Sequence, residues 1–222
     1  YREFMQADFD IVGNVDPAQA NAELCNLISS TLSDCGLNKD QFTINVSNRK
    51  IVQGLINELK ISEEKQVKVI RAIDKLDKPG FGLKGVEDLL KKERKDQSGA
   101  ITKGADLTDQ QAAQILNFLK IKDLKELKQT LKNQLSQEGI SELENLFEIL
   151  GYGSNLNQVK TNFTIVRGLA YYSDFIVETN LNFKVTNNKG KEVDIGSICS
   201  GGAYAKLISR FRGVDIPGTG IS

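Results

Sequence analysis

The sequence changes character near residues 60 and 155, and this change limits the fold more than any other feature. Between these points apolar residues recur with helical spacing, as Val67 and Ile70 illustrate. On either side, short runs rich in β-forming residues predict strands. A sheet interrupted by a helical block predicts an α+β fold. We expect a core over residues 1–60 and 156–222 and a helical insertion domain over residues 61–155.

The first core segment is predicted to contain two strands and two helices. Residues 1–13 alternate in polarity with the period of a strand, which places Gln6 and Asp10 on one face. A helix follows, because Asp16 can cap it and Pro17 suits its first position. The expected elements are a strand over residues 1–13, a helix over 17–36, a strand over 42–46 and a helix over 49–59.

The pattern inside the helical block and after it gives further elements. Within the block, Thr108 and Gln111 have the spacing of a capping box, which predicts a helix start. After the block, Asn187 to Gly190 predict the turn of a hairpin. The expected elements there are strands over residues 163–167, 175–178, 183–185 and 195–199, and a helix over residues 204–211.

Composition excludes several classes of protein and of site. Lys+Arg and Asp+Glu are equal at 29 each, so any contact with RNA would be local. The sequence has no apolar stretch of about 20 residues and no signal peptide, which predicts no membrane partner and a cytoplasmic location. The three cysteines lack C-x-x-C spacing, which predicts buried, reduced thiols rather than disulfides or a zinc site.

The chain contains no histidine, and this absence restricts its chemistry. Ser-His-Asp and Cys-His nucleophilic sites and histidine-based metal sites are excluded. We identify no metal-ligating set of side chains. Any reaction must therefore use arginine, carboxylates, amides and tyrosines.

The first candidate segment contains Gln6 and Asp10. In a strand their Cα atoms would lie roughly 13 Å apart on one side. An amide and a carboxylate along one wall suit a zwitterionic ligand with an ammonium group. A strand face that is merely exposed to solvent explains the same alternation.

Two further segments combine glycine with tyrosine. In the first, Arg167 and Gly168 precede Tyr171 and Tyr172, so a permanent charge and two phenols could share a pocket; structural tyrosines at a strand bend are the alternative. In the second, Gly201-Gly202 precede Tyr204. Paired glycines allow the backbone to approach a ligand closely, although they also suit a turn.

Together these segments resemble the histidyl-tRNA synthetases, which are class II aminoacyl-tRNA synthetases. Residues 1–13 resemble the latter half of class II motif 2, and Arg167-Gly168-Leu169-x-Tyr171-Tyr172 resembles the first histidine-specific motif. Gly201-Gly202-x-Tyr204 resembles the second, and residues 71–78 are also similar to these enzymes. The three segments stand in the family's order, so the resemblance spans nearly the whole chain.

The resemblance implies part of the class II antiparallel sheet and a defined reaction. In this family ATP, with Mg²⁺, activates L-histidine to histidyl-adenylate, and the histidine passes to tRNA(His) on a homodimeric enzyme. Asp10 would pair with the α-ammonium group of histidine, and Arg167 would be the catalytic cation that stabilises negative charge. The residues expected to bind histidine are Gln6, Asp10, Arg167, Tyr171, Tyr172 and Tyr204, with Gly201 and Gly202 allowing backbone approach.

The chain departs from the family at three positions. Ala203 and Ala205 stand where the family usually has Arg and Asp, and Ala170 stands where an acidic residue is frequent. Motif 1, the ATP-contacting arginine of motif 2 and the motif 3 arginine are expected outside residues 1–222. We therefore expect an internal piece of the enzyme that is inactive alone. The alternatives are a non-catalytic paralogue that senses histidine or regulates a partner enzyme, and a generic α/β binding module.

Overall fold

The computed structural model of the chain describes residues 3–78, 80–95, 101–153, 157–166, 172–193, 195–214 and 216–222. It divides into two compact units. Unit 1 comprises Tyr1–Arg49, Ser141–Asn162 and Gly168–Ser222, and unit 2 comprises Lys50–Ile140 and Phe163–Arg167. The insertion domain expected over residues 61–155 stays a prediction.

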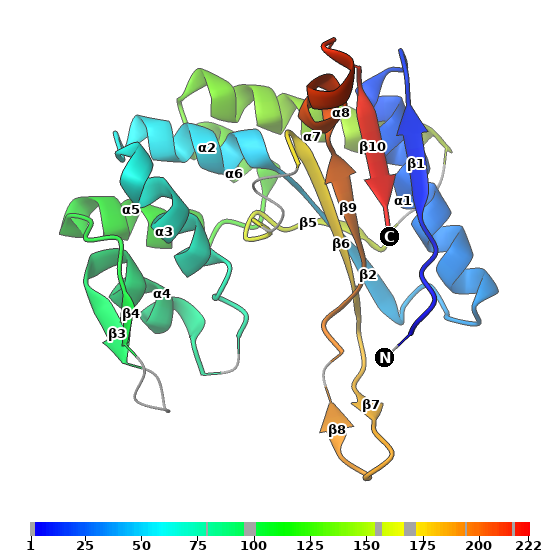
Figure 1. The fold of residues 1–222 in the computed structure, drawn as a ribbon, viewed down its shortest axis with the longest axis horizontal. Coiled ribbons are helices and arrows are strands. Elements are labelled where there is room, and N and C mark those ends of the chain that lie inside the picture. The colour runs from blue at the N-terminus through cyan, green and yellow to red at the C-terminus, as the bar shows by residue number, and fades with distance from the viewer. Residues whose placement is uncertain are drawn as a thin grey trace. The chain divides into compact units, whose positions relative to one another are not determined.

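Unit 1 is built on a six-stranded sheet. Its strands run in the order β1-β10-β9-β6-β2-β5, as Figure 1 shows, and all neighbours are antiparallel except β2 and β5. This confirms the α+β prediction. The strands are β1 (Phe9–Val12), β2 (Phe42–Asn48), β5 (Val159–Thr161), β6 (Phe175–Leu181), β9 (Ser197–Ala203) and β10 (Gly218–Ile221). Unit 1 also holds α1 (Pro17–Asp34), α8 (Ala205–Arg212) and the hairpin of β7 (Val185–Thr186) and β8 (Glu192–Val193).

Helix α1 begins where the sequence predicts it. Asp16 caps the helix by accepting a hydrogen bond from the backbone N–H of Gln19 at 2.9 Å, and Pro17 is the first helical residue. The helix contacts β10, β9 and β2. Its apolar side chains Leu24, Cys25 and Ile28 are buried, so α1 covers one face of the sheet.

The two faces of the sheet differ in polarity because side chains alternate along each strand. One face carries Val46 and Val177 in the interior of the sheet, and both are buried. The other face carries a polar row in which Asn45 lies opposite Glu178 and Glu178 lies opposite Ser200. The polar face is therefore the face on which a polar ligand could be bound.

Unit 2 is mainly helical. It contains α3 (Glu63–Ile73), α4 (Gly82–Lys91), α5 (Asp109–Phe118), α6 (Leu124–Thr130), most of α2 (Arg49–Glu58), the start of α7 (Gln134–Gly153) and the hairpin of β3 (Glu93–Lys95) and β4 (Ile101–Lys103). The capping box at the start of α5 is confirmed, since Thr108 and Gln111 exchange both hydrogen bonds. The core of the unit includes Leu90, Ile115 and Phe118, which are buried.

Several predicted elements are confirmed and two are wrong. The helix over residues 49–59, the strand over 42–46 and the hairpin turn at 187–190 are present. The strand over residues 1–13 is wrong for residues 3–8, which form no regular structure. The strand over 163–167 is also wrong, because residues 163–164 form a turn and 165–166 are irregular; Arg167 lies outside the described residues. Strands β3, β4, β5 and β10 were not predicted.

Candidate functional site

A row of residues crosses the polar face of the sheet where two of the candidate segments meet. Asp10 of β1 lies opposite Gly220 of β10. Gly220 lies opposite Gly202 of β9, which lies opposite Ile176 of β6. Directly opposed residues of neighbouring strands share a face of the sheet. The two glycines therefore form a floor without side chains beside Asp10.

The Asp10 carboxylate leans over this floor. A Cβ atom at Gly220 would lie 1.9 Å from Oδ1 of Asp10, so only glycine leaves room for the carboxylate there. The Tyr204 phenol donates a hydrogen bond to the same oxygen, across 194 residues of sequence. The structure thus brings Asp10 of the first segment to Tyr204 of the third. A carboxylate has about four lone-pair sites, so Asp10 keeps acceptor capacity for a ligand.

Tyr204 is fixed from both its backbone and its ring. It is only 7% exposed, and its backbone N–H donates to the Gly218 carbonyl oxygen at 2.8 Å. A Cβ atom at Gly218 would lie 2.9 Å from Cε2 of Tyr204, so the ring occupies the space above this glycine. A buried phenol usually has a hydrogen-bond partner, and for Tyr204 that partner is Asp10.

Gln6 precedes β1 but still reaches the same face. Its side-chain Nε2 donates to Oγ of Ser222 at 2.8 Å. Ser222 follows Gly220 by two residues, which places both on one face of the sheet. Gln6 and Asp10 therefore lie along β10 on the polar face, although the strand expected to join them begins only at Phe9.

Tyr172 and the paired glycines of β9 pack against each other. A Cβ atom at Gly202 would lie 2.9 Å from Cδ1 of Tyr172, so the tyrosine ring covers this glycine. At Gly201 a Cβ atom would lie 2.1 Å from the Gly220 carbonyl oxygen. Both glycines are thus required by close contacts inside the protein. Their role in approaching a ligand stays a prediction.

Arg167, Ala170 and Tyr171 lie outside the described residues. Ala203 is the last residue of β9 and Ala205 the first of α8, so the two departures from the family flank the buried Tyr204.

Two glycines of β10 that belong to this site were not predicted from the sequence. Gly218 and Gly220 make room for Tyr204 and Asp10, respectively. Two glycines separated by one residue in a strand share a face, and this spacing was the signal that could have identified them.

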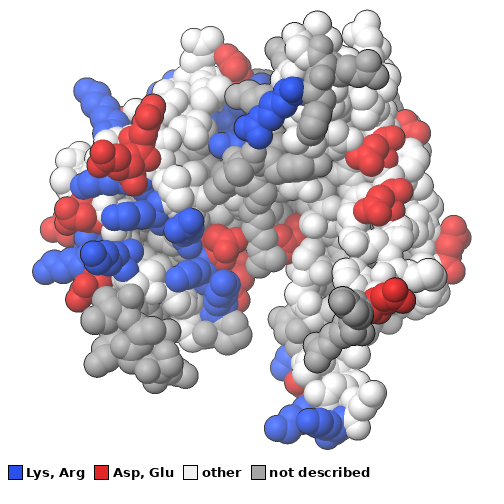
Figure 2. All heavy atoms as spheres, in the orientation of Figure 1, with Lys and Arg blue, Asp and Glu red and all other residues white. Residues whose placement is uncertain are grey.

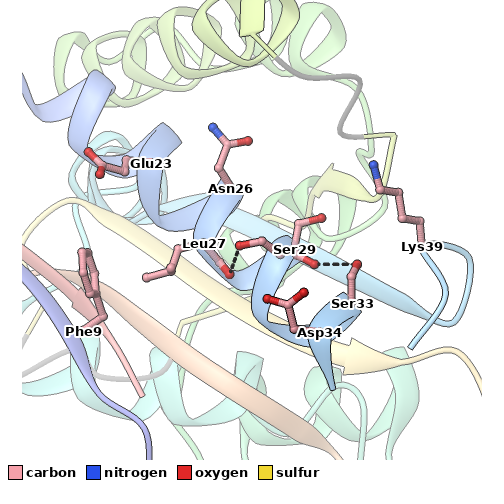
Figure 3. Close-up of a pocket in the computed structure, with 9 residues that line it drawn as sticks. Phe9, Glu23, Asn26, Leu27, Ser29, Ser33, Asp34 and Lys39 are labelled. Carbon is pink, nitrogen blue, oxygen red and sulfur yellow. Dashed lines mark hydrogen bonds between the residues drawn. The ribbon is translucent and has the colours of Figure 1, made fainter. Parts of the chain in front are cut away.

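A separate cavity lies along α1 and is lined by Phe9, Glu23, Asn26, Leu27, Ser29, Ser30, Ser33, Asp34 and Lys39, with a volume of about 580 Å³ (Figure 3). Two of its hydroxyls already bond to α1: Ser33 donates to the Ser29 carbonyl oxygen at 2.9 Å, and Ser30 donates to that of Leu27 at 3.1 Å. Phe9 belongs to the face that α1 covers, because its neighbour Asp10 points to the other face. The cavity is therefore not part of the site around Asp10.

The cysteines differ in exposure. Burial raises the pKa of the Cys25 thiol to about 12 and that of Cys199 to about 11, and Cys199 adds to the effect on Cys25. These two thiols are protonated at neutral pH and are poor nucleophiles. Cys35 is exposed and Cys199 is half-buried, so the expectation of burial is confirmed for Cys25 and wrong for Cys35.

None of the described helices is long and apolar enough to cross a membrane. The described part of the chain also contains no group of three or more Cys, Asp or Glu side chains placed to hold a metal ion.

Charge is divided between the two units. Lysine and arginine outnumber aspartate and glutamate in unit 2, and the reverse holds in unit 1. Figure 2 shows many of the basic side chains of unit 2, interspersed with carboxylates. The zero net charge of the chain thus conceals a basic helical unit.

Comparison with known proteins decides the family. The sequence profile described as Histidyl-tRNA synthetase matches residues 1–222. The chain belongs to the histidyl-tRNA synthetase family. It is 77% identical over 222 residues to a histidine–tRNA ligase of Pelagibacter ubique (strain HTCC1062), covering all of this chain and 48% of that protein. It thus spans about half the length of the curated relatives it matches.

Two solved structures share the fold. The histidyl-tRNA synthetase from Nostoc sp. PCC 7120 superposes with a TM-score of 0.75 at 29% identity, over 96% of this chain and 47% of that chain. An ATP phosphoribosyltransferase regulatory subunit/histidyl-tRNA synthetase from Bacillus halodurans C gives a TM-score of 0.72 at 18% identity, over 96% and 49% of the two chains. At 18% identity the second likeness shows the fold alone.

Proposed function

We propose that the full-length protein is a histidine–tRNA ligase, which uses ATP to activate L-histidine and transfers it to tRNA(His). The observation that carries the proposal is the hydrogen bond from Tyr204 to Asp10, which joins the second histidine-specific segment to the motif 2 segment beside a floor of glycine. Mg²⁺ is proposed only as the ion that accompanies ATP. From the family resemblance we also propose that the full-length protein is a homodimer and that it lies in the cytoplasm.

In this proposal Asp10 binds the α-ammonium group of histidine. The carboxylate is exposed at the edge of the glycine floor, and Tyr204 fixes one of its oxygens. A hydrogen bond between the ammonium group of histidine and this carboxylate would contribute about 1.5–3 kcal/mol to binding. Gln6 would help to hold the same substrate.

The tyrosines and Arg167 would act on the other parts of histidine. The phenols of Tyr171, Tyr172 and Tyr204 would line the imidazole pocket, with Gly201 and Gly202 allowing close approach. Arg167 would stabilise the negative charge that develops as the histidine carboxylate attacks the α-phosphate of ATP. No proton transfer by a histidine side chain is required, which suits a chain that has none.

The role of Asp10 can be tested by calorimetry on the full-length protein. Asp10→Asn is expected to weaken binding of L-histidine about tenfold or more, because one ion pair is lost. Binding of imidazole lactate, which lacks the ammonium group, should change little. Asp34→Asn is the matched control, since Asp34 is exposed on α1. Equal losses for both ligands would contradict the assignment.

The basic unit 2 is proposed to contact tRNA. Lys120 and Lys125 are exposed in this unit and could neutralise phosphates of the RNA. Replacing both by Gln should raise the KM for tRNA(His) and leave the KM for histidine unchanged in aminoacylation assays. An unchanged KM for tRNA would remove these lysines from the proposed contact.

The second candidate is a non-catalytic relative that senses histidine. Ala203 and Ala205 favour it, because two charges usual in the family are missing beside Tyr204. Such a protein would bind histidine but would not exchange pyrophosphate into ATP. Measuring both properties on the full-length protein separates the two functions.

A further inference from the structure

The segment that carries Tyr172 is held by an arginine from another part of unit 1. Arg49 stands at the junction of β2 and α2, and its guanidinium Nη1 donates to the Tyr172 carbonyl oxygen at 2.7 Å. The backbone N–H of Arg49 donates to the Asp174 carbonyl oxygen at 2.8 Å. One residue thus binds the backbone on both sides of Ser173.

The opposite side of the segment is bound to β9. The backbone N–H of Ser173 donates to the Ala203 carbonyl oxygen at 2.7 Å, and the Ser173 hydroxyl donates to Oδ2 of Asp174 at 2.7 Å. Residues 172–174 are therefore bridged between Arg49 and Ala203. Ala203 directly precedes Tyr204, so this bridge links the position of Tyr172 to that of Tyr204.

The position of the Tyr172 ring depends on this bridge. The ring covers Gly202, which lies next to Gly220 in the row that ends at Asp10. A shift of the Tyr172 carbonyl would move the ring across the glycine floor. Residues 167–171, which precede Tyr172, lie outside the described residues. At the first described residue of the segment, Arg49 binds the carbonyl oxygen of Tyr172.

The environment of Arg49 suits a permanent charge in a fixed place. The side chain is half-buried, and burial lowers the pKa of the guanidinium while the nearby Asp174 carboxylate raises it. Arginine stays protonated in such surroundings, and its planar donors hold a direction that lysine does not. Lysine could supply one donor but not the same geometry.

We infer that Arg49 is a positioning residue for the histidine pocket, which sets the place of Tyr172 by binding its carbonyl oxygen. Arg49 acts through the backbone and touches no substrate. The inference rests on the proposed function, and it adds a residue outside the three histidine-related segments.

The test uses the full-length protein in ATP–pyrophosphate exchange, which needs no tRNA. Arg49→Gln is expected to raise the KM for histidine about tenfold, equivalent to ~1.4 kcal/mol, with the KM for ATP within about twofold of wild type. Arg49→Lys should restore part of the loss, because it keeps the charge and one donor. Arg71→Gln, at an exposed arginine of α3, is the control and should match wild type.

Two results would overturn the inference. One is an unchanged KM for histidine in a folded Arg49→Gln protein. The other is a rise in both KM values together with a fall in kcat and in melting temperature, which would indicate a purely structural role. If wild type shows no exchange at all, the proposed function fails instead. The same variants are then compared by calorimetric affinity for histidine, where the tenfold difference is again expected.

Discussion

Replacing Gly202 by alanine should disturb both the sheet and the histidine pocket. The new Cβ atom would lie 2.4 Å from the Phe175 carbonyl oxygen and 2.9 Å from Cδ1 of Tyr172. The carbonyl belongs to β6, which pairs with β9 along its length, so it cannot move away alone. Overpacking of this kind costs roughly 1–3 kcal/mol. The gain from restricting the unfolded chain is smaller, about 0.4–1 kcal/mol.

The assay compares Gly202→Ala with Gly151→Ala in the full-length protein. Gly151 lies exposed in α7 with no atom near its missing Cβ, so alanine there should be neutral or stabilise by about 0.5–1 kcal/mol. Gly202→Ala should lower the melting temperature by about 2–4 °C per kcal/mol lost and should weaken histidine binding. Equal melting temperatures and equal histidine affinities in the two variants would refute the reasoning from packing.

Two further predictions concern α1 and the thiols. Asp16→Ala should destabilise the protein by about 1 kcal/mol in thermal unfolding, since it removes the cap of α1, whereas Ser62→Ala should have little effect because Ser62 makes no capping bond at α3. A similar loss in both variants would contradict this. With a thiol reagent at pH 8, Cys35 should react first, the half-buried Cys199 more slowly, and the buried Cys25 only on unfolding, as peptide mapping would show. Equally rapid labelling of Cys25 and Cys35 in the folded protein would contradict this order.

Local signals predicted those elements whose boundaries depend on local chemistry. Asp16-Pro17 and the Thr108–Gln111 capping box mark helix starts through short-range hydrogen bonds, and both helices begin there. The apolar run at 163–166 gave a wrong strand prediction, because its side chains are buried although the residues form no strand. A short apolar run does not distinguish a buried strand from a buried irregular segment.

Strand β10 escaped prediction for a tertiary reason. Glycine has low β-propensity, so Gly218 and Gly220 argue against a strand when they are considered locally. They are required because the Tyr204 ring and the Asp10 carboxylate fill the space above them. The contact between Asp10 and Tyr204 likewise depends on strand order, which the sequence pattern alone does not give.

The central claim is tested most directly by assaying the full-length protein for charging of tRNA(His). With L-histidine, ATP and Mg²⁺, the account predicts pyrophosphate exchange that depends on histidine and formation of histidyl-tRNA, both reduced tenfold or more by Asp10→Asn at subsaturating histidine. Tight binding of histidine without exchange or charging would contradict the ligase function and would support a histidine sensor.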